Sequence, residues 1–149
     1  MIAVDTNILV YAHRLDSDSY EEADRALTEL AESGRPWAIP WPCIHEFFAI
    51  TTHPRVFDAP STSQQAREQI RCWLEAPTLT LLAEGAGYWG VLEELLSESR
   101  VVGPRVHDAR IAALCLLHGV RELWTADRDF GRFSRLRTRN PVTGATPRP

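Results

Sequence analysis

Lysine is absent from this chain of 149 residues, in which all 16 Lys-or-Arg positions are arginine. No lysine ammonium group is therefore available to bind a phosphate. Planar arginine side chains could take over that role, although a codon-biased genome explains the replacement at least as well. The net charge of −4 argues against a nucleic-acid partner, because polyanions select basic surfaces. The segment 128–139 weakens this objection, since it carries five arginines and a single acidic residue.

Cysteine and long hydrophobic runs are also scarce. The three cysteines, Cys43, Cys72 and Cys115, lack CxxC spacing, and each lies in a helix-like apolar segment. They predict reduced, buried thiols rather than disulfides or a zinc site. No hydrophobic run approaches the ~20 residues that span a bilayer, and no basic, cleavable leader precedes Ile2. We therefore expect a cytoplasmic protein that does not associate with a membrane.

Strand-like and helix-like segments alternate along the chain, which is typical of a parallel sheet with helices on its faces. The length fits one α/β domain. We predict a central parallel sheet of about five short strands, flanked by helices, within residues 1–140. The remaining residues, 141–149, have too little apolar content to pack and are expected to form a loosely held tail.

The predicted elements follow from periodicity, capping and turn signals. Strands are expected at 2–5, 37–40, 78–82, 123–125 and 135–138. Helices are expected at 6–14, 18–32, 42–52, 61–75, 87–99 and 104–118, the fourth of them opened by Ser61 or Ser63.

Four acidic residues stand where solvation alone does not explain a carboxylate: Asp5, Glu46, Asp108 and Asp127. Asp5 ends the first strand and Asp127 follows the strand at 123–125, and open α/β sheets bind ligands at such carboxyl ends. Asp108 lies in the first turn of a helix and projects toward the strand ends, while Glu46 interrupts an uncharged run. Carboxylates that are brought together repel one another, and a hard divalent cation relieves this repulsion.

Each of these acids also has a purely structural interpretation. Asp5 can cap the following helix, and Glu46 can be an exposed residue on the polar side of its helix. Asp108 can cap as well, but Pro104 can start that helix, which leaves Asp108 without an obvious capping role.

Polar neighbours are candidates to support the acidic cluster. Asn7 can hold the Asp5 carboxylate through a hydrogen bond, and Thr125 can orient a carboxylate or a bound water. Asp129 either caps the turn after the strand or serves as an outer ligand. The remaining candidates are Thr6 as a further support and, for contacts to phosphate, Arg110 and Arg128.

Four segments in this order resemble a known family. They are IAVDTN at 2–7, Glu46 in the third predicted helix, VHDA at 106–109 and TADRDF at 125–130. Each motif is weak alone, but their spacing over nearly the whole chain and the alternating α/β pattern resemble a PIN-domain ribonuclease of the VapC toxin type.

The resemblance implies an acidic site of Asp5, Glu46, Asp108 and Asp127 that binds Mg²⁺ or Mn²⁺ and hydrolyses RNA phosphodiester bonds. It also implies the toxin of a toxin–antitoxin pair, which forms a homodimer and is neutralised by a small VapB-like antitoxin. The RNA substrate comes from the resemblance alone, because no residue identifies a contact to the ribose 2′-hydroxyl.

Two other functions stay open. A haloacid-dehalogenase-type phosphohydrolase also begins with a strand that ends in Asp. It needs a second Asp two residues later, where this chain has Asn7, and it uses a lysine, which this chain lacks. In a non-catalytic binding module, the four acids would only cap helices, and the apolar helices would bind a partner. Only cleavage activity distinguishes such a module from a nuclease.

Overall fold

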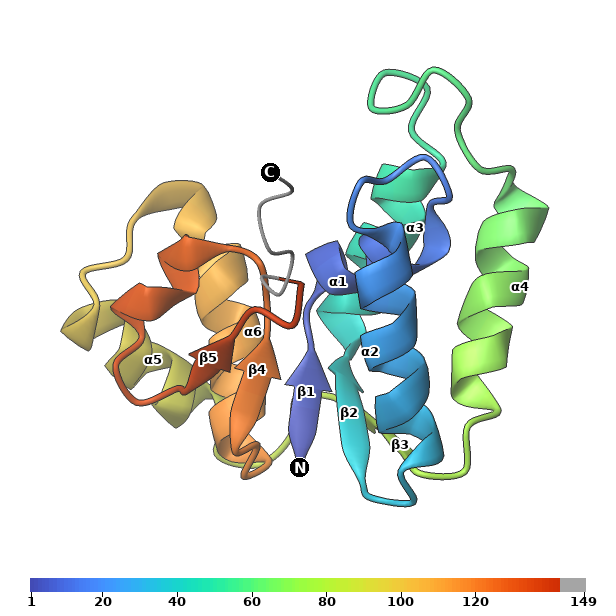
Figure 1. Cartoon of the computed structure of the whole chain (residues 1–149). Coiled ribbons are helices and arrows are strands. Elements are labelled where there is room, and N and C mark those ends of the chain that lie inside the picture. Colours follow the sequence, from blue (N-terminus) through green and yellow to red (C-terminus); the bar gives the residue numbers. More distant parts are fainter. Residues whose placement is uncertain (143–149) are drawn as a thin grey trace, which may run out of the picture.

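Five short parallel strands form the centre of the structure, in the order β3-β2-β1-β4-β5 (Figure 1). The strands are β1 (Ile2–Val4), β2 (Trp37–Pro40), β3 (Leu79–Leu82), β4 (Glu122–Trp124) and β5 (Thr138–Arg139). This computed structural model describes residues 1–142, so residues 143–149, most of the predicted tail, lie outside the described part of the chain. All four strand pairings are parallel, which confirms the predicted α/β class and five-stranded sheet.

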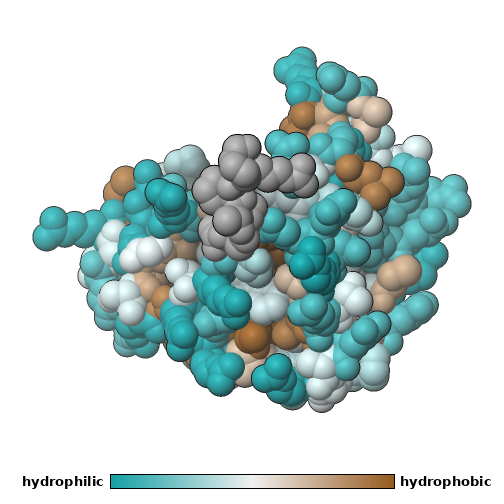
Figure 2. Space-filling view, viewed as in Figure 1, coloured by the Kyte–Doolittle hydropathy of each residue, from teal (hydrophilic) through white to brown (hydrophobic). Residues whose placement is uncertain are grey.

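Helices cover the sheet from both sides. They are α1 (Thr6–His13), α2 (Tyr20–Glu32), α3 (Trp41–Thr51), α4 (Ser63–Leu74), α5 (Tyr88–Glu98) and α6 (Val106–Leu117), with short 3₁₀ turns η1 (Gly103–Arg105) and η2 (Arg128–Arg132). In Figure 1, α1 and α2 lie in front of the sheet, and α6, which packs against α5, lies behind it. No helix crosses in front of β4 and β5, and hydrophilic side chains dominate this part of the surface (Figures 1 and 2). None of the helices within the described residues has the length and hydrophobicity to cross a membrane.

Most predicted elements are present, with ends shifted by one or two residues, but two differ for identifiable reasons. The helix predicted at 104–118 begins at Val106, because Pro104 lies in η1. The last strand, predicted at 135–138, pairs only at 138–139. The preceding residues are held in a turn, in which the Leu136 amide donates to the Phe133 carbonyl at 2.9 Å.

Two predictions about single residues in and near α4 are wrong. Thr62, rather than Ser61 or Ser63, caps this helix and forms a reciprocal capping box with Gln65. Cys72 is exposed, whereas the other two cysteines are buried as predicted. Cys72 directly precedes the buried Trp73, and neighbouring helical positions point about 100° apart, so the thiol faces solvent.

The hydrophobic core fixes the helix that carries Glu46. Phe47, the next residue on α3, is fully buried. Its ring meets the Trp73 ring of α4 edge-on at 4.7 Å and the His13 ring of α1 at 5.2 Å, measured between ring centres. These aromatic contacts hold α3 against both α1 and α4.

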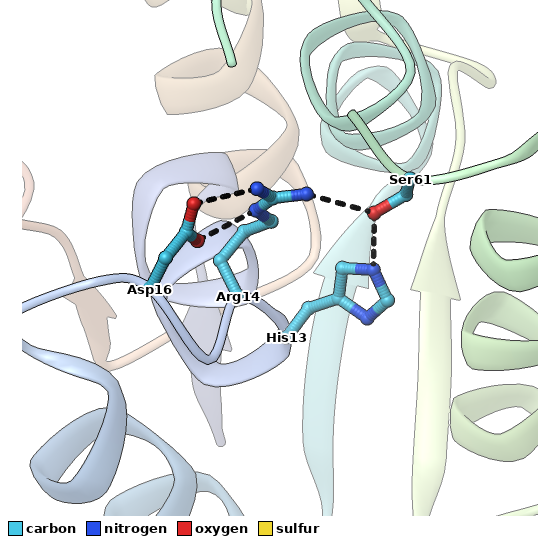
Figure 3. Close-up of polar contacts among 4 residues, drawn as sticks. All are labelled: His13, Arg14, Asp16 and Ser61. Atoms are coloured by element: carbon cyan, nitrogen blue, oxygen red, sulfur yellow. Dashed lines mark hydrogen bonds and ion pairs between the residues drawn. The ribbon is translucent and has the colours of Figure 1, made fainter. Parts of the chain in front are cut away.

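A polar cluster joins the end of α1 to the loop before α4 (Figure 3). Arg14 is buried and donates two hydrogen bonds to Asp16, at 2.9 and 2.6 Å, and a longer one to Ser61 at 3.4 Å. His13 Nε2 lies 2.9 Å from the same Ser61 hydroxyl oxygen. This cluster fixes the long loop 52–62 to α1.

Phe47→Ala is expected to lower the free energy of unfolding by about 3–5 kcal/mol, because it leaves a cavity among three packed helices. Phe48→Ala, at the half-buried neighbouring position, should cost clearly less. Denaturant unfolding followed by circular dichroism measures both variants. Equal losses would show that the Phe47 ring is not the anchor of α3.

Candidate active site

The four predicted acids come from four different elements. Asp5 directly follows β1 and caps α1, while Asp127 follows β4 and caps η2. Glu46 lies in the middle of α3, and Asp108 lies in the first turn of α6. The two capping roles coexist with the predicted acidic cluster, because a carboxylate has two oxygens and each cap uses one of them.

Asp5 is the most enclosed of the four acids, with 3% of its surface exposed. Its Oδ1 accepts a hydrogen bond from the Thr6 amide at 2.7 Å and a weaker one from the Cys43 thiol at 3.7 Å. Its Oδ2 accepts from the Thr125 hydroxyl at 2.7 Å and from the Asn7 side-chain amide at 3.1 Å. Donors from α1, α3 and the end of β4 therefore fix the orientation of this carboxylate.

Asn7 and Thr125 connect the ends of β1 and β4. The Asn7 amide oxygen accepts from the Ala126 backbone amide at 3.0 Å, and its nitrogen donates to the Thr125 hydroxyl oxygen at 3.2 Å. The same hydroxyl oxygen accepts from the Asp127 backbone amide at 3.0 Å. Both side chains lie against Asp5, where the sequence predicted them, and Thr125 extends the network to Asp127.

Glu46 has a specific partner in the site. Its Oε2 accepts a hydrogen bond from the Thr6 hydroxyl at 2.7 Å, and Thr6 is itself buried next to Asp5. Glu46 is half-buried, so the alternative of an exposed glutamate on a polar helix face is wrong.

Asp108 is half-buried and has no hydrogen-bonding or ion-pair partner for its carboxylate among residues 1–142. Asp127 Oδ1 accepts from the Asp129 backbone amide at 2.8 Å and so caps η2. Two roles were left open for Asp129, a cap of this turn or an outer ligand, and the cap is provided by Asp127. Asp129 is exposed and lies 3.8 Å from Arg105.

The acids influence one another's ionisation. Burial raises the pKa of Asp5 to about 6, and the charge of Glu46 adds to this rise, although the Thr125 hydrogen bond opposes it. Burial also raises the pKa of Asp108, and the charges of Asp127 and Glu46 raise it further. The four carboxylates thus share one region in which their charges disfavour one another. A bound divalent cation relieves such repulsion.

The donor set fits a hard cation, although no three acidic, His or Cys side chains within residues 1–142 form a ready-made metal cage. Mg²⁺ does not require such a cage, because it keeps several waters and binds through one or two carboxylates. Burial raises the pKa of the Cys43 thiol well above its usual range, so this neighbour stays protonated and is a poor ligand. The oxygen donors therefore fit Mg²⁺ or Mn²⁺ better than zinc.

Cys43 is the site residue whose role the sequence did not reveal. We predicted only a buried thiol there. The available signal was its spacing, because Cys43 precedes Glu46 by three positions on the same helix and therefore shares its face.

The two arginines predicted to contact phosphate differ in their surroundings. Arg110 on α6 forms an ion pair with Glu84 at 3.2 Å. Arg128 is exposed at the start of η2, next to Asp127, and its side chain has no ion pair within the described residues. Arg128 is therefore the more accessible of the two to an anion.

Known proteins resemble this chain over nearly its full length. The PIN domain family model matches residues 2–136. Ribonuclease VapC43 of Mycobacterium tuberculosis is 36% identical over 146 residues, which cover 98% of this chain and 99% of that protein. Ribonuclease VapC48 of the same species is 31% identical over 142 residues, which cover 94% and 97%.

Solved structures share the fold. VapBC2 from Rickettsia felis, bound to a DNA fragment from its promoter, aligns with a TM-score of 0.69 and 23% identity, covering 94% of this chain and 98% of that one. VapC20 of Mycobacterium tuberculosis, a toxin that cleaves the sarcin-ricin loop, aligns with a TM-score of 0.65 and 15% identity, covering 88% and 93%.

Asp108→Asn is expected to stabilise the metal-free protein at neutral pH, by no more than about 1 kcal/mol because the side chain is partly solvated. A carboxyl whose pKa rises on folding destabilises the folded state when it is ionised. The gain should therefore shrink as the pH falls through the raised pKa of Asp108 toward the ordinary aspartate value. Thermal unfolding in EDTA at a series of pH values measures this difference.

Asp24→Asn, at an exposed position on α2, is the matched control and should change neither the midpoint nor its pH dependence. A lower midpoint for Asp108→Asn at neutral pH, or a gain that does not vary with pH, would contradict repulsion within the acidic cluster.

Proposed function

The chain belongs to the PIN-domain family, and from this premise we propose that it is a metal-dependent endoribonuclease that acts as the toxin of a toxin–antitoxin pair. The observation that carries the proposal is a group of four carboxylates near the ends of β1 and β4. Burial raises the pKa of Asp5 and of Asp108, and the charges of Glu46 and Asp127 add to these rises. The similarity to VapC ribonucleases extends over almost the whole of both chains and supports the same activity.

Mg²⁺ or Mn²⁺ is the proposed cofactor. Asp5 and Asp108 are the proposed primary ligands, and Glu46 and Asp127 are further ligands or orient the attacking water. When bound, a divalent cation lowers the pKa of water and stabilises the negative charge that develops on the phosphate.

Two threonine hydroxyls orient carboxylates of the proposed site. The hydroxyls of Thr125 and Thr6 donate to Asp5 and Glu46 at 2.7 Å each, and they keep the two carboxylates in a fixed orientation. In the proposed reaction, a water attacks phosphorus in line, and a carboxylate of the cluster accepts one proton of this water. The bond to the leaving sugar oxygen breaks, and this oxygen takes up a proton from solvent to form the hydroxyl of the second product.

Arg128 is the proposed contact for the substrate phosphate, because it is exposed beside Asp127. Arg110 is a second candidate, and its surface ion pair with Glu84 is weak enough to exchange for a phosphate.

The phosphohydrolase alternative is not retained. Position 7, where that chemistry needs an acid, carries an asparagine that connects β1 to β4.

A VapB-like antitoxin is the proposed protein partner, and a homodimer is the proposed assembly. The likeness to VapBC2, which combines both components, supports the antitoxin. The proposed location is the cytoplasm, because that is where the proposed substrate, cellular RNA, is found. We propose that the antitoxin blocks Asp5 and Glu46, for example with an arginine that binds both carboxylates.

The purified, partner-free protein should cut cellular RNA at discrete positions in the presence of Mg²⁺ or Mn²⁺, and EDTA should prevent the cuts. Asp5→Asn and Asp108→Asn should each reduce the rate by more than the ~10–100-fold typical for loss of an outer support around a metal. End sequencing of the products identifies the cut sites.

Asp24→Asn should cleave like the wild type, and circular dichroism should show that all variants are folded. Wild-type rates in either site variant would rule out the assigned ligands. No cleavage by folded, metal-loaded wild-type protein would instead favour a non-catalytic binding module.

Thr6→Val keeps the size of the side chain but removes the hydroxyl that orients Glu46. We expect about 10–100-fold weaker activation by Mg²⁺, because supporting residues around a metal have effects of this size. Thr6→Ser, which retains a hydroxyl, should recover most of the loss. Rates titrated against Mg²⁺ measure both, and an unchanged metal dependence in Thr6→Val would exclude this positioning role.

A further inference from the structure

An arginine-lined cleft lies on the part of the sheet that no helix covers. It has a volume of about 740 Å³ and runs between α2 and the strands β4 and β5. Ile2 and Trp124 contribute to its floor. Its basic residues are Arg25, Arg35, Arg121, Arg137 and Arg139. In Figure 2, hydrophilic side chains surround a small hydrophobic area in this region.

Acidic residues in the cleft neutralise only part of this charge. Glu122 is buried and forms an ion pair with Arg137 at 3.1 Å. Arg25 lies between Glu22 and Glu29 on α2, at the helical spacings that allow ion pairs. Glu122 is thus paired with an arginine just before β5, and Glu22 and Glu29 lie one helical turn from Arg25 on α2.

Three of the arginines have neither an ion pair within residues 1–142 nor an acidic residue one helical turn away. The side chains of Arg35, Arg121 and Arg139 form no hydrogen bond or ion pair within residues 1–142. They concentrate positive charge on the sheet side of the cleft, in a protein whose net charge is −4. This local charge favours an anionic ligand.

The cleft begins beside the candidate active site. The Thr125 backbone amide donates to the Arg139 carbonyl at 2.9 Å, so Arg139 adjoins the residue that holds Asp5. The Arg139 guanidinium lies 5.9 Å from the centre of the Trp124 ring. From there the cleft follows the sheet to Arg121, just before β4. Four residues of strand span about 13 Å, which leaves room for more than one phosphate.

We propose that this cleft binds the backbone of single-stranded RNA on one side of the bond that is cut. The inference rests on the proposed nuclease function and extends it to substrate binding away from the acids. Arginine forks match phosphate oxygens in pairs, and such contacts set affinity and register without reading sequence. An acidic protein repels a polyanion elsewhere on its surface, so a local basic path is needed to hold the substrate.

The test is binding of fluorescein-labelled oligouridylate of about 12 nucleotides, within the ~4–16 typical of single-strand sites. Fluorescence anisotropy in EDTA, with the full-length protein at several salt concentrations, reports binding without cleavage. The variant pair is Arg35→Gln with Arg121→Gln, neither of which belongs to the proposed catalytic cluster. Arg55→Gln with Arg71→Gln, at exposed positions in and near α4, makes the same charge change elsewhere.

The cleft pair should weaken binding about 10-fold and reduce the slope of log affinity against log salt by about 1.4, or ~0.7 for each lost phosphate contact. The control pair should change neither by more than about twofold. Equal affinity and slope in the cleft pair and wild type, or no RNA binding by folded wild-type protein, would overturn the proposal. So would a loss of affinity for a labelled polyglutamate peptide but not for RNA, because the occupant would then be an acidic polypeptide.

Cleavage of cellular RNA with Mg²⁺, measured on the same proteins, separates the two proposals. Normal cleavage together with unchanged oligouridylate binding in the cleft pair would overturn the cleft and leave the nuclease assignment intact. Weaker binding in the cleft pair, with no cleavage by any protein, would support the cleft and count against the nuclease.

Discussion

The hydrogen bonds that converge on the Asp5 carboxylate connect α1, α3 and the end of β4. Burial makes the ionised form of this group unfavourable and raises its pKa to about 6, despite those donors. The neighbouring Glu46 adds repulsion instead of relieving it. A domain that only needed to fold would be better served by an uncharged residue at such a position. The arrangement is therefore best understood as a preformed acceptor of positive charge.

Several features of the fold could be predicted because local signals and tertiary packing agree. Alternating apolar segments indicated the parallel sheet, and glycine and capping residues located most helix ends within two positions. The choice of Thr62 among three adjacent hydroxyl residues could not be predicted, because all three are good caps and only backbone geometry selects one. The uncovered face of β4 and β5 depends on strand order, which short strands do not encode locally.

In the site, too, some features could be predicted from local sequence and others depend on tertiary packing. Asp5 and Asp127 could be located because strand ends are visible in the sequence, and some of their hydrogen-bond donors follow within two residues. The contact between Thr6 and Glu46 joins residues that are 40 positions apart. It exists because aromatic packing around Phe47 sets α3 against α1. The ion pair between Arg110 and Glu84 also joins residues that are 26 positions apart, so it likewise depends on tertiary packing.

β1 has only three residues, yet it is paired on both sides, with Ile2 opposite Trp37 in one ladder and Glu122 in the other. A slip of this strand would have to break both ladders at once and would turn its buried side chains toward the opposite face of the sheet. Because the register of β1 is fixed on both sides, the position of Asp5, the residue directly after the strand, is fixed relative to the sheet. The position of Asp5 relative to the sheet is therefore set by backbone pairing, which a change of side chain on a neighbouring strand leaves in place.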